Sequence, residues 1–161
     1  MLTGLDPQIR GVRWVPTDQL HLTMSFLGQV DEELEEKLRT SLVKVRVPPF
    51  FLPIQGVGVF GGDHPTTLWA GVGKGHPHLF ALHKHVQDAL LQSGFEPDLR
   101  AFHPHITLAR LKDTSRQTLR PFLHRYEATE FDLWQVTGFV LFSSVLSPEG
   151  ATHTVELRRE F

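Results

Sequence analysis

The chain contains His21-Leu22-Thr23-Met24 near its start and His105-Ile106-Thr107-Leu108 in its second half. Each stretch is a histidine, an apolar residue, a threonine and a second apolar residue. In an extended strand, alternate side chains point to opposite faces. The histidine and threonine of each stretch therefore share one face, and the apolar pair anchors the other face in a core. If the two strands face each other across a cleft, two imidazoles and two hydroxyls line one site.

Two imidazoles and two hydroxyls suit acid–base chemistry on a phosphate, and they require neither a metal ion nor a thiol. Histidine has an ordinary pKa of about 6.5, so one ring can take up a proton near neutral pH while another gives one up. Read alone, His21 is typical of a partly exposed strand histidine, and only its counterpart His105 favours a functional site. His103 is on the same strand face as His105 but belongs to neither motif, so we expect it at the rim with no catalytic task.

The composition is that of a soluble globular chain. The 161 residues are 40% hydrophobic and 21% charged, which predicts one domain over residues 1–161 with a real core. No apolar run approaches the ~20 residues that span a bilayer, and the start lacks the basic and apolar regions of a secretory signal. The sequence has no cysteine, which excludes disulfides and a thiol nucleophile. We expect a cytoplasmic location.

The net charge and the histidine content limit the kinds of ligand that the chain is expected to bind. The formal net charge of −2 argues against a generally basic nucleic-acid binder, so an anionic ligand would be held by a local cluster. The sequence has 10 histidines, several in His-x-His pairs. A zinc site usually needs three or four converging ligands with cysteine or carboxylate help, and no such spacing occurs. We predict no metal and no cofactor.

The hydrophobic pattern predicts an α+β chain in which helices and hairpins follow one another without strict β-α-β alternation. Strands are predicted over 20–28, 50–60 with Phe51 buried, 67–72, 104–111, 127–142 and 152–157. Helices are predicted from Asp31 to about Arg46, over 76–92, and from a cap at Thr114 or Ser115 to a stop before Pro121. Gly56 and Gly58 mark a bulge or a close approach. Each half carries one His-x-Thr strand and a helix, which suggests two sheets in a pseudo-twofold arrangement.

The residues around both motifs resemble a known family. Arg13-Trp14-Val15-Pro16 followed by residues 20–28 is similar to the first signature of the two-histidine (2H) phosphoesterases. Within that group the similarity is to the RNA 2′,3′-cyclic phosphodiesterases, formerly called 2′-5′ RNA ligases. Residues 104–110 resemble the second signature, including its trailing Arg110. Similarity extends over Gly58-Val59-Phe60, Leu68-Trp69-Ala70-Gly71 and Leu141 to Val155.

This resemblance implies a two-lobed, pseudo-twofold α+β fold, in which two antiparallel sheets face a central cleft and the helices pack outside. Two departures from the family pattern stand out. Family members usually begin with a strand and most of a helix before the Arg-Trp-Val-Pro segment, so we expect that part to be lacking here. His153 stands where a tyrosine is common, and we assign it no role.

The resemblance also implies a substrate, RNA or a nucleotide ending in a 2′,3′-cyclic phosphate. Water attacks phosphorus, the 3′ oxygen leaves, and a 2′-phosphate remains. We assign His105 as general base for the water and His21 as general acid for the 3′ oxygen, with the swapped assignment nearly as well supported. Thr23 and Thr107 would donate hydrogen bonds to the non-bridging oxygens. Ligation of RNA ends through a 2′-5′ linkage is the reverse reaction that the family name implies.

Further residues are candidates for substrate binding. Arg110 can neutralise phosphate charge or be a surface cation, and Arg13 can contact a further phosphate. Phe60 and Trp69 can stack on a base, although Trp69 is better explained as core. Ser25 continues the face of His21 and is expected to line the cleft.

Three other readings stay open at this point. The enzyme could act on another small cyclic phosphate, the chain could be a catalytically silent RNA- or nucleotide-binding module, or a metal could assist. Intact histidines and threonines in both motifs argue against the silent module. We expect a monomer that binds neither a membrane nor a protein partner.

Overall fold

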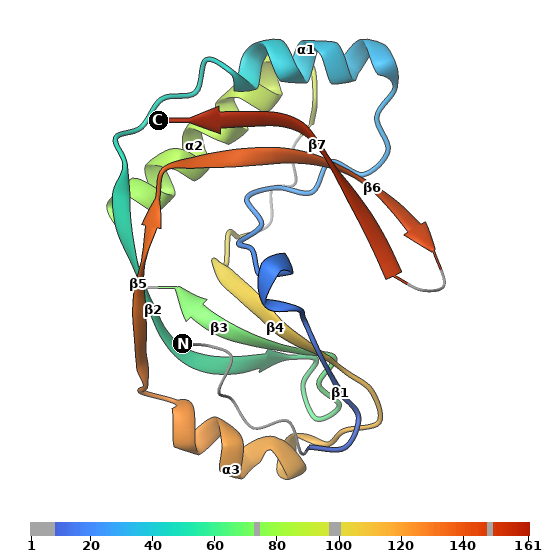
Figure 1. The fold of residues 1–161 in the computed structure, drawn as a ribbon, viewed down its shortest axis with the longest axis vertical. Helices are drawn as coiled ribbons and strands as arrows, with labels where there is room; N and C mark the ends of the chain where they lie inside the picture. The colour runs from blue at the N-terminus through green and yellow to red at the C-terminus, as the bar shows by residue number, and fades with distance from the viewer. Residues whose placement is uncertain (1–8, 73–74, 97–100, 148–149) are drawn as a thin grey trace. The chain divides into compact units, whose positions relative to one another are not determined.

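The computed structural model describes residues 9–72, 75–96, 101–147 and 150–161 (Figure 1). The chain divides into two compact units, and each unit combines three separate stretches. Unit 1 consists of Met1–Met24, Leu52–Lys74 and Ala101–Trp134, and unit 2 of Ser25–Phe51, Gly75–Arg100 and Gln135–Phe161.

A five-stranded sheet in the order β1-β4-β3-β2-β5 dominates unit 1. The β1–β4, β4–β3 and β3–β2 pairs are antiparallel. The elements are β1 (Val12–Trp14), the 3-10 helix η2 (Thr17–Gln19), β2 (Phe50–Phe60), β3 (Thr67–Val72), β4 (His105–Leu111), α3 (Arg116–Tyr126) and β5 (Glu130–Val136).

One face of this sheet forms the core of unit 1. Its inward side chains include Leu68, Ile106 and Leu108, all at most 2% exposed. Helix α3 contributes the buried Phe122, whose ring centroid lies 6.3 Å from that of Trp14 on β1. Burying each such side chain contributes about 1.5–3 kcal/mol, so this face anchors the sheet.

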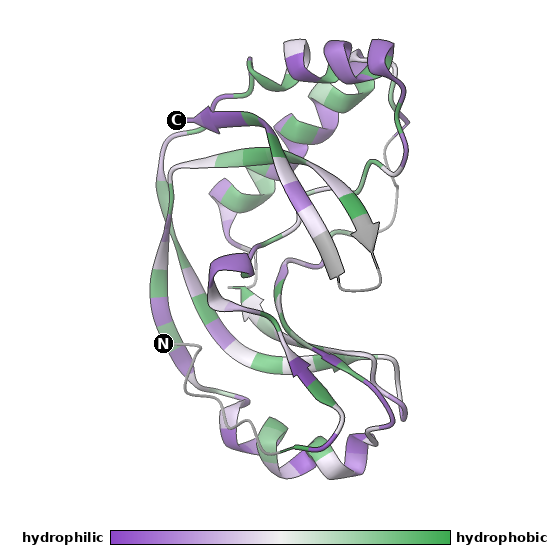
Figure 2. Ribbon diagram, turned by 45° about the vertical axis from the view of Figure 1, so that its right-hand side comes forward, coloured by the Kyte–Doolittle hydropathy of each residue, from purple (hydrophilic) through white to green (hydrophobic). Residues whose placement is uncertain are grey.

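The strand over 50–60 is confirmed as β2, but the prediction that Phe51 is buried is wrong. Phe51 is 57% exposed, whereas Phe50 is 5% exposed and stacks on His76, with ring centroids 5.3 Å apart. The two neighbours point to opposite faces, and Phe50 is in phase with the buried Leu52 and Ile54. Figure 2 shows hydrophobic residues recurring along β2 with more polar residues between some of them.

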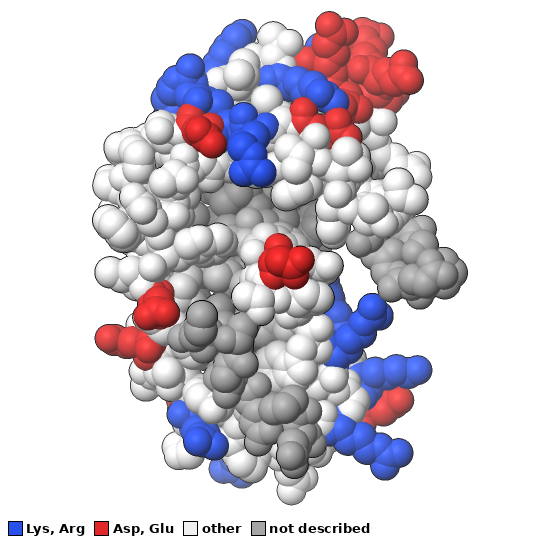
Figure 3. Space-filling model, viewed as in Figure 1, with Lys and Arg blue, Asp and Glu red and all other residues white. Residues whose placement is uncertain are grey.

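Unit 2 contains two helices and a hairpin: α1 (Glu32–Leu42), α2 (Pro77–Gln92), β6 (Gly138–Ser147) and β7 (Gly150–Glu160). Asp31 caps α1 as predicted, accepting a hydrogen bond from the backbone N–H of Leu34 at 2.8 Å. Figure 3 shows acidic side chains gathered over the first turn of α1, where they interact favourably with the positive end of the helix dipole. The α2 helix is confirmed, and its predicted apolar stripe is buried: Leu79, Leu82, Val86 and Leu90.

Two predicted helix ends are wrong. Helix α1 stops at Leu42 rather than near Arg46, because Val45 and Val47 turn into the core and the Arg46 guanidinium donates to the Val43 carbonyl at 2.7 Å. Helix α3, capped by Ser115, does not stop before Pro121 but continues to Tyr126. The buried residues on either side of the proline hold the helix together although the ring removes one backbone hydrogen bond.

The predicted strand over 20–28 is also wrong. Leu22 alone in this stretch makes a β-bridge, to Ile106 of β4. Strand β4 begins at His105, which lies opposite Thr23, so β4 offers no partner to the residues that follow. The predicted strand over 127–142 is two strands, β5 and β6, separated at Thr137.

The α+β class with two antiparallel sheets is confirmed. The two His-x-Thr motifs, one from each half of the sequence, both belong to unit 1. Within the described residues, no helix is long and apolar enough to cross a membrane.

Candidate functional site

The two motifs lie side by side rather than across a cleft. The antiparallel bridge between Leu22 and Ile106 places His21 opposite Thr107 and Thr23 opposite His105. Residues directly opposite in such a pair have Cβ atoms about 4.5–5.5 Å apart and share one face. Ile106, on the other face, is 2% exposed. The four polar side chains therefore lie together on the face that the core does not cover.

An antiparallel pair has a local twofold axis, and this one exchanges His21 with His105 and Thr23 with Thr107. The hydrogen bonds follow the same symmetry. Nδ1 of His21 lies 2.7 Å from the carbonyl oxygen of Gln19, and Nδ1 of His105 lies 2.8 Å from that of His103. A carbonyl only accepts, so Nδ1–H donates and the lone pair of each neutral ring is on Nε2.

Helix η2 brings the first motif to this position. Strand β1 pairs with the far end of β4, where Trp14 lies opposite Ala109, and the Val15 N–H then donates to the Leu108 carbonyl at 2.8 Å. The η2 turn then takes the chain away from β4, and it returns at Leu22. Gln19 ends this turn and supplies the carbonyl that orients His21.

A β-bulge in β4 sets the direction of Arg110. Thr107 pairs with Trp69 and Ala109 with Leu68, so Leu108 is the extra residue. Leu108 and Ala109 are both buried, at 2% and 0% exposure. Arg110 therefore returns to the exposed face of His105 and Thr107, where strict alternation would not place it. Its guanidinium donates to the Thr67 hydroxyl at 3.1 Å.

Arg13 lies on the same face. It is directly opposite Arg110 in the β1–β4 register, and both side chains are exposed. Its neighbour Trp14 points the other way, toward α3. Figure 3 shows Lys and Arg side chains, with an acidic side chain among them, along the edge of unit 1 near β1.

Aromatic rings surround His105. The Phe60 ring is nearly perpendicular to the imidazole, at 84° and 4.9 Å between centroids, and Trp69 lies 6.5 Å away. Trp69 is half-buried on the histidine face rather than in the core. Its ring covers Gly58, where an added Cβ would lie 2.3 Å from an indole carbon, so the predicted close approach at Gly58 is confirmed.

Three other residues discussed from the sequence are not assigned to this cluster. Ser25 is the first residue of unit 2, so its place in the site stays a prediction. His103 has an exposed side chain, and its carbonyl is what orients His105. His153, across the β6–β7 hairpin, lies 2.8 Å from the Ser144 hydroxyl through Nδ1.

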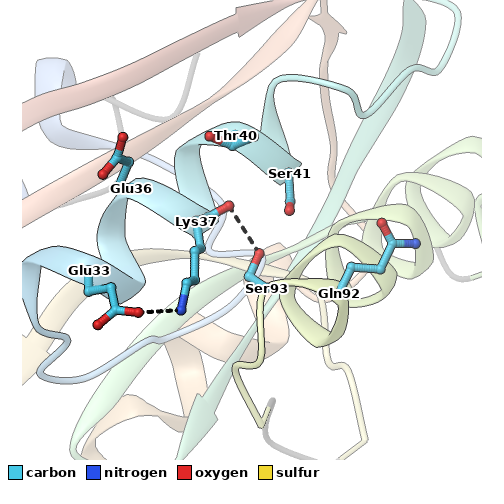
Figure 4. A pocket seen from close by; sticks show the side chains of 7 residues that line it. All are labelled: Glu33, Glu36, Lys37, Thr40, Ser41, Gln92 and Ser93. Carbon is cyan, nitrogen blue, oxygen red and sulfur yellow. Dashed lines mark hydrogen bonds and ion pairs between the residues drawn. The ribbon is translucent and has the colours of Figure 1, made fainter.

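The described residues contain no group of three or more histidine, aspartate or glutamate side chains arranged to hold a metal ion. A polar recess between α1 and α2 of unit 2 contains none of the predicted site residues (Figure 4). Its Lys37 is paired with Glu33 at 2.6 Å, and its Ser93 hydroxyl donates to the Lys37 carbonyl at 3.3 Å. These groups are already satisfied, and we assign the recess no role.

Residues 7–157 match the sequence pattern of the 2′-5′ RNA ligase superfamily. The chain belongs to that superfamily. An RNA 2′,3′-cyclic phosphodiesterase of Aquifex aeolicus is 33% identical over 155 residues, which are 94% of this chain and 82% of that protein. One of Escherichia coli is 34% identical over 125 residues, 76% of this chain and 69% of that protein.

Solved structures of similar proteins have the same fold. A Thermus thermophilus protein gives a TM-score of 0.75 at 28% identity, covering 99% of this chain and 86% of that one. Escherichia coli LigT complexed with 3′-AMP gives 0.75 at 27% identity, covering 98% and 85%. The family predicted from the two motifs is confirmed.

Proposed function

We propose that this protein hydrolyses 2′,3′-cyclic phosphate ends of RNA, or of a nucleotide, to 2′-phosphates. The observation that carries the proposal is the Leu22–Ile106 bridge, which gathers two histidines and two threonines on one open face. The relatives named RNA 2′,3′-cyclic phosphodiesterase support the substrate class.

The histidines act as an acid–base pair. Diagonal neighbours across an antiparallel pair are about 7–8 Å apart, which leaves room for one phosphate between the His21 and His105 rings. His105 takes a proton from the attacking water, and His21 gives a proton to the departing 3′ oxygen. Attacking and leaving oxygens stand roughly in line in phosphoryl transfer, so one ring on each side of phosphorus fits the reaction.

The hydroxyls and cations stabilise charge. Thr23 and Thr107 donate to the non-bridging oxygens, and such preoriented donors favour the transition state. Arg110 and Arg13 supply positive charge for substrate phosphates. Phe60 contacts the base, and Ser25 lines the substrate path.

Catalysis needs no metal ion or other cofactor. The protein acts as a cytoplasmic monomer, which size-exclusion chromatography with light scattering tests for the oligomeric state. Joining of RNA ends through a 2′-5′ linkage is the same reaction run backward at high end concentration.

The test is hydrolysis of a short RNA with a 2′,3′-cyclic end and of a nucleoside 2′,3′-cyclic monophosphate, both in EDTA. Wild type is compared with His21→Ala, His105→Ala and the control His124→Ala, whose ring is exposed on α3. We expect a 2′-phosphate product that either motif substitution removes and the control retains. Full turnover by either motif variant, or dependence of wild type on added metal, contradicts the mechanism. Tight binding of both substrates without turnover identifies a silent binding module.

A further inference from the structure

Part of the β6–β7 hairpin in unit 2 is exposed on both faces. Residues 142–145 of β6 and 152–155 of β7 are all exposed, whereas residues 138–141 are half-buried. Antiparallel sheets usually place polar residues on a face that water covers. Phe142 and Val155 instead lie directly opposite each other, and they are 47% and 46% exposed. The hairpin therefore has apolar surface that the protein itself does not cover.

A β-bulge decides which face carries this surface. Leu141 pairs with Leu157 and Phe142 pairs with Val155, so Glu156 is the extra residue. Leu141 and Leu157 are half-buried, and Phe142, as the next residue on β6, points to the opposite face. Residues two apart on β6 share that face with their partners on β7. We call this surface the hairpin face: Val140, Phe142, Ser144, His153, Val155 and Arg158.

The Phe142 ring is held in a fixed direction on the hairpin face. The His153 ring lies 5.9 Å from it between centroids, at an interplanar angle of 65°. Nδ1 of His153 in turn lies 2.8 Å from the Ser144 hydroxyl. A ring that is already ordered loses little further freedom when a flat partner stacks on its exposed side. The arrangement therefore suits a planar ligand.

The charges on the hairpin face favour an anion. Arg158 is exposed there, directly opposite Val140. The neighbouring carboxylate, that of Glu156, accepts from the Ser143 hydroxyl at 2.6 Å and from the Arg39 guanidinium of α1. Ser143 is next to Phe142 on β6, so Glu156 is bound on the other face. The hairpin face thus combines an aromatic ring and a cation and includes no carboxylate.

A ring and a cation on one strand pair are the groups that bind single-stranded nucleic acid, in which bases stack on aromatic side chains and cations contact the backbone. The pair that holds Arg158 is two residues from Phe142 along β6. At about 3.4 Å per residue the two positions are about 7 Å apart, so one strand can contact both groups.

We propose that the hairpin face binds a nucleotide of single-stranded RNA, with its base stacked on Phe142 and a phosphate at Arg158. The proposed function supplies the identity of the strand as RNA, and the inference rests on it to that extent. It adds a binding site in unit 2 to the catalytic face of unit 1. Stacking is tolerant of sequence, so the site binds different bases alike.

The test is fluorescence anisotropy with a labelled, short single-stranded RNA that ends in a 2′-phosphate and is not hydrolysed. Stacking on an aromatic ring contributes enough that we expect Phe142→Ala to bind about tenfold more weakly. Phe142→Tyr keeps the ring and stays within twofold of wild type. The control Phe51→Ala removes a ring of β2 that is 57% exposed, and it leaves the affinity unchanged. An abasic strand of equal length binds wild type and Phe142→Ala alike.

A salt titration tests the cation. Neutralising one phosphate of a single strand contributes about 0.7 to the slope of log affinity against log salt. Arg158→Gln therefore lowers the slope by about 0.7, whereas Phe142→Ala weakens binding without changing it. The control Lys44→Gln removes another exposed charge of unit 2 and leaves the slope unchanged. An unchanged slope in Arg158→Gln would overturn the assignment of a phosphate to this residue.

Three further results overturn the inference: unchanged RNA affinity in Phe142→Ala, equal losses in Phe142→Ala and Phe142→Tyr, or an equal loss on the abasic strand. If Phe142→Ala changes the oligomeric state and not the RNA affinity, the occupant of the hairpin face is a second copy of the chain. The binding assay needs no turnover. Loss of affinity in Phe142→Ala with no hydrolysis by wild type contradicts the proposed function alone. Hydrolysis with unchanged affinity contradicts the hairpin face alone.

Discussion

His21 and His105 each donate Nδ1–H to the carbonyl two residues earlier, yet the two rings have different surroundings. His105 is half-buried at the start of strand β4, beside Phe60 and Trp69. His21 is exposed, and it is held by a short turn and a single bridge. The same local geometry is therefore built by two kinds of support, a packed sheet and a turn.

This difference concerns which of the two histidines acts as the acid and which as the base. The twofold axis makes the acid and base interchangeable by geometry alone, and only the surroundings distinguish them. A ring held by packing against aromatic side chains keeps a fixed direction for activating water. In the proposed assignment the more exposed ring, that of His21, protonates the departing 3′ oxygen.

The largest expected effect is loss of either histidine. His21→Ala and His105→Ala each lower kcat by about 10²–10⁴-fold, since each removes one proton transfer. The double variant falls little below the worse single variant, because residues acting as a unit are non-additive. Single-turnover assays on cyclic-ended RNA measure this. Multiplied losses in the double variant would mean that the two rings act independently.

Removing the hydroxyls tests the symmetry itself. Thr23→Val and Thr107→Val keep the side-chain shape and remove one donor each, and each lowers kcat by about 10²-fold. The two losses agree within a few-fold if both threonines contact the same phosphate. A loss confined to one variant, measured under the same conditions, breaks the twofold account of the site.

Gly58→Ala perturbs the His105 side alone. The new methyl group would lie 2.3 Å from the Trp69 ring, which must shift and disturb the packing beside His105. Overpacking of this kind costs about 1–3 kcal/mol, which urea unfolding measures, and we expect kcat to fall with it. Adding Trp69→Phe, a smaller ring, restores part of both. Unchanged stability and activity in Gly58→Ala would show that Trp69 gives no support.

The smallest effect is expected from His103→Ala. The variant keeps the backbone carbonyl that accepts from His105, and only an exposed side chain is lost. Activity on cyclic-ended RNA stays within twofold of wild type. A loss comparable to that of His105→Ala would place the His103 ring itself in the reaction.

The sequence predicts the elements in which apolar residues recur with one regular spacing. Helix α2 keeps its apolar spacing from Leu79 to Leu90, and the β2–β3 hairpin is bounded by glycine and proline. The four motif residues follow from the repeated pattern. That both motifs share one unit could not be predicted, because it depends on a non-local pairing of Leu22 with Ile106.

Features that the sequence pattern does not determine depend on pairing and tertiary packing. The bulge at Leu108 turns Arg110 to the histidine face, and no turn residue in the sequence marks it. Phe50 and Phe51 are identical in chemistry, and Phe50 is the buried one because it is in phase with Leu52 and Ile54 and stacks on His76. Pro121 breaks a helix on propensity, but the buried Leu119 and Phe122 hold α3 across it.

The pH dependence of single-histidine variants tests the division of labour most directly. For wild type, kcat/KM on cyclic-ended RNA rises and then falls with pH, because one group must be unprotonated and another protonated. His105→Ala loses the acidic limb, since the base is gone, and His21→Ala loses the alkaline limb, since the acid is gone. Exchange of these two results would reverse the assignment. Retention of both limbs in either variant would contradict acid–base catalysis by this pair.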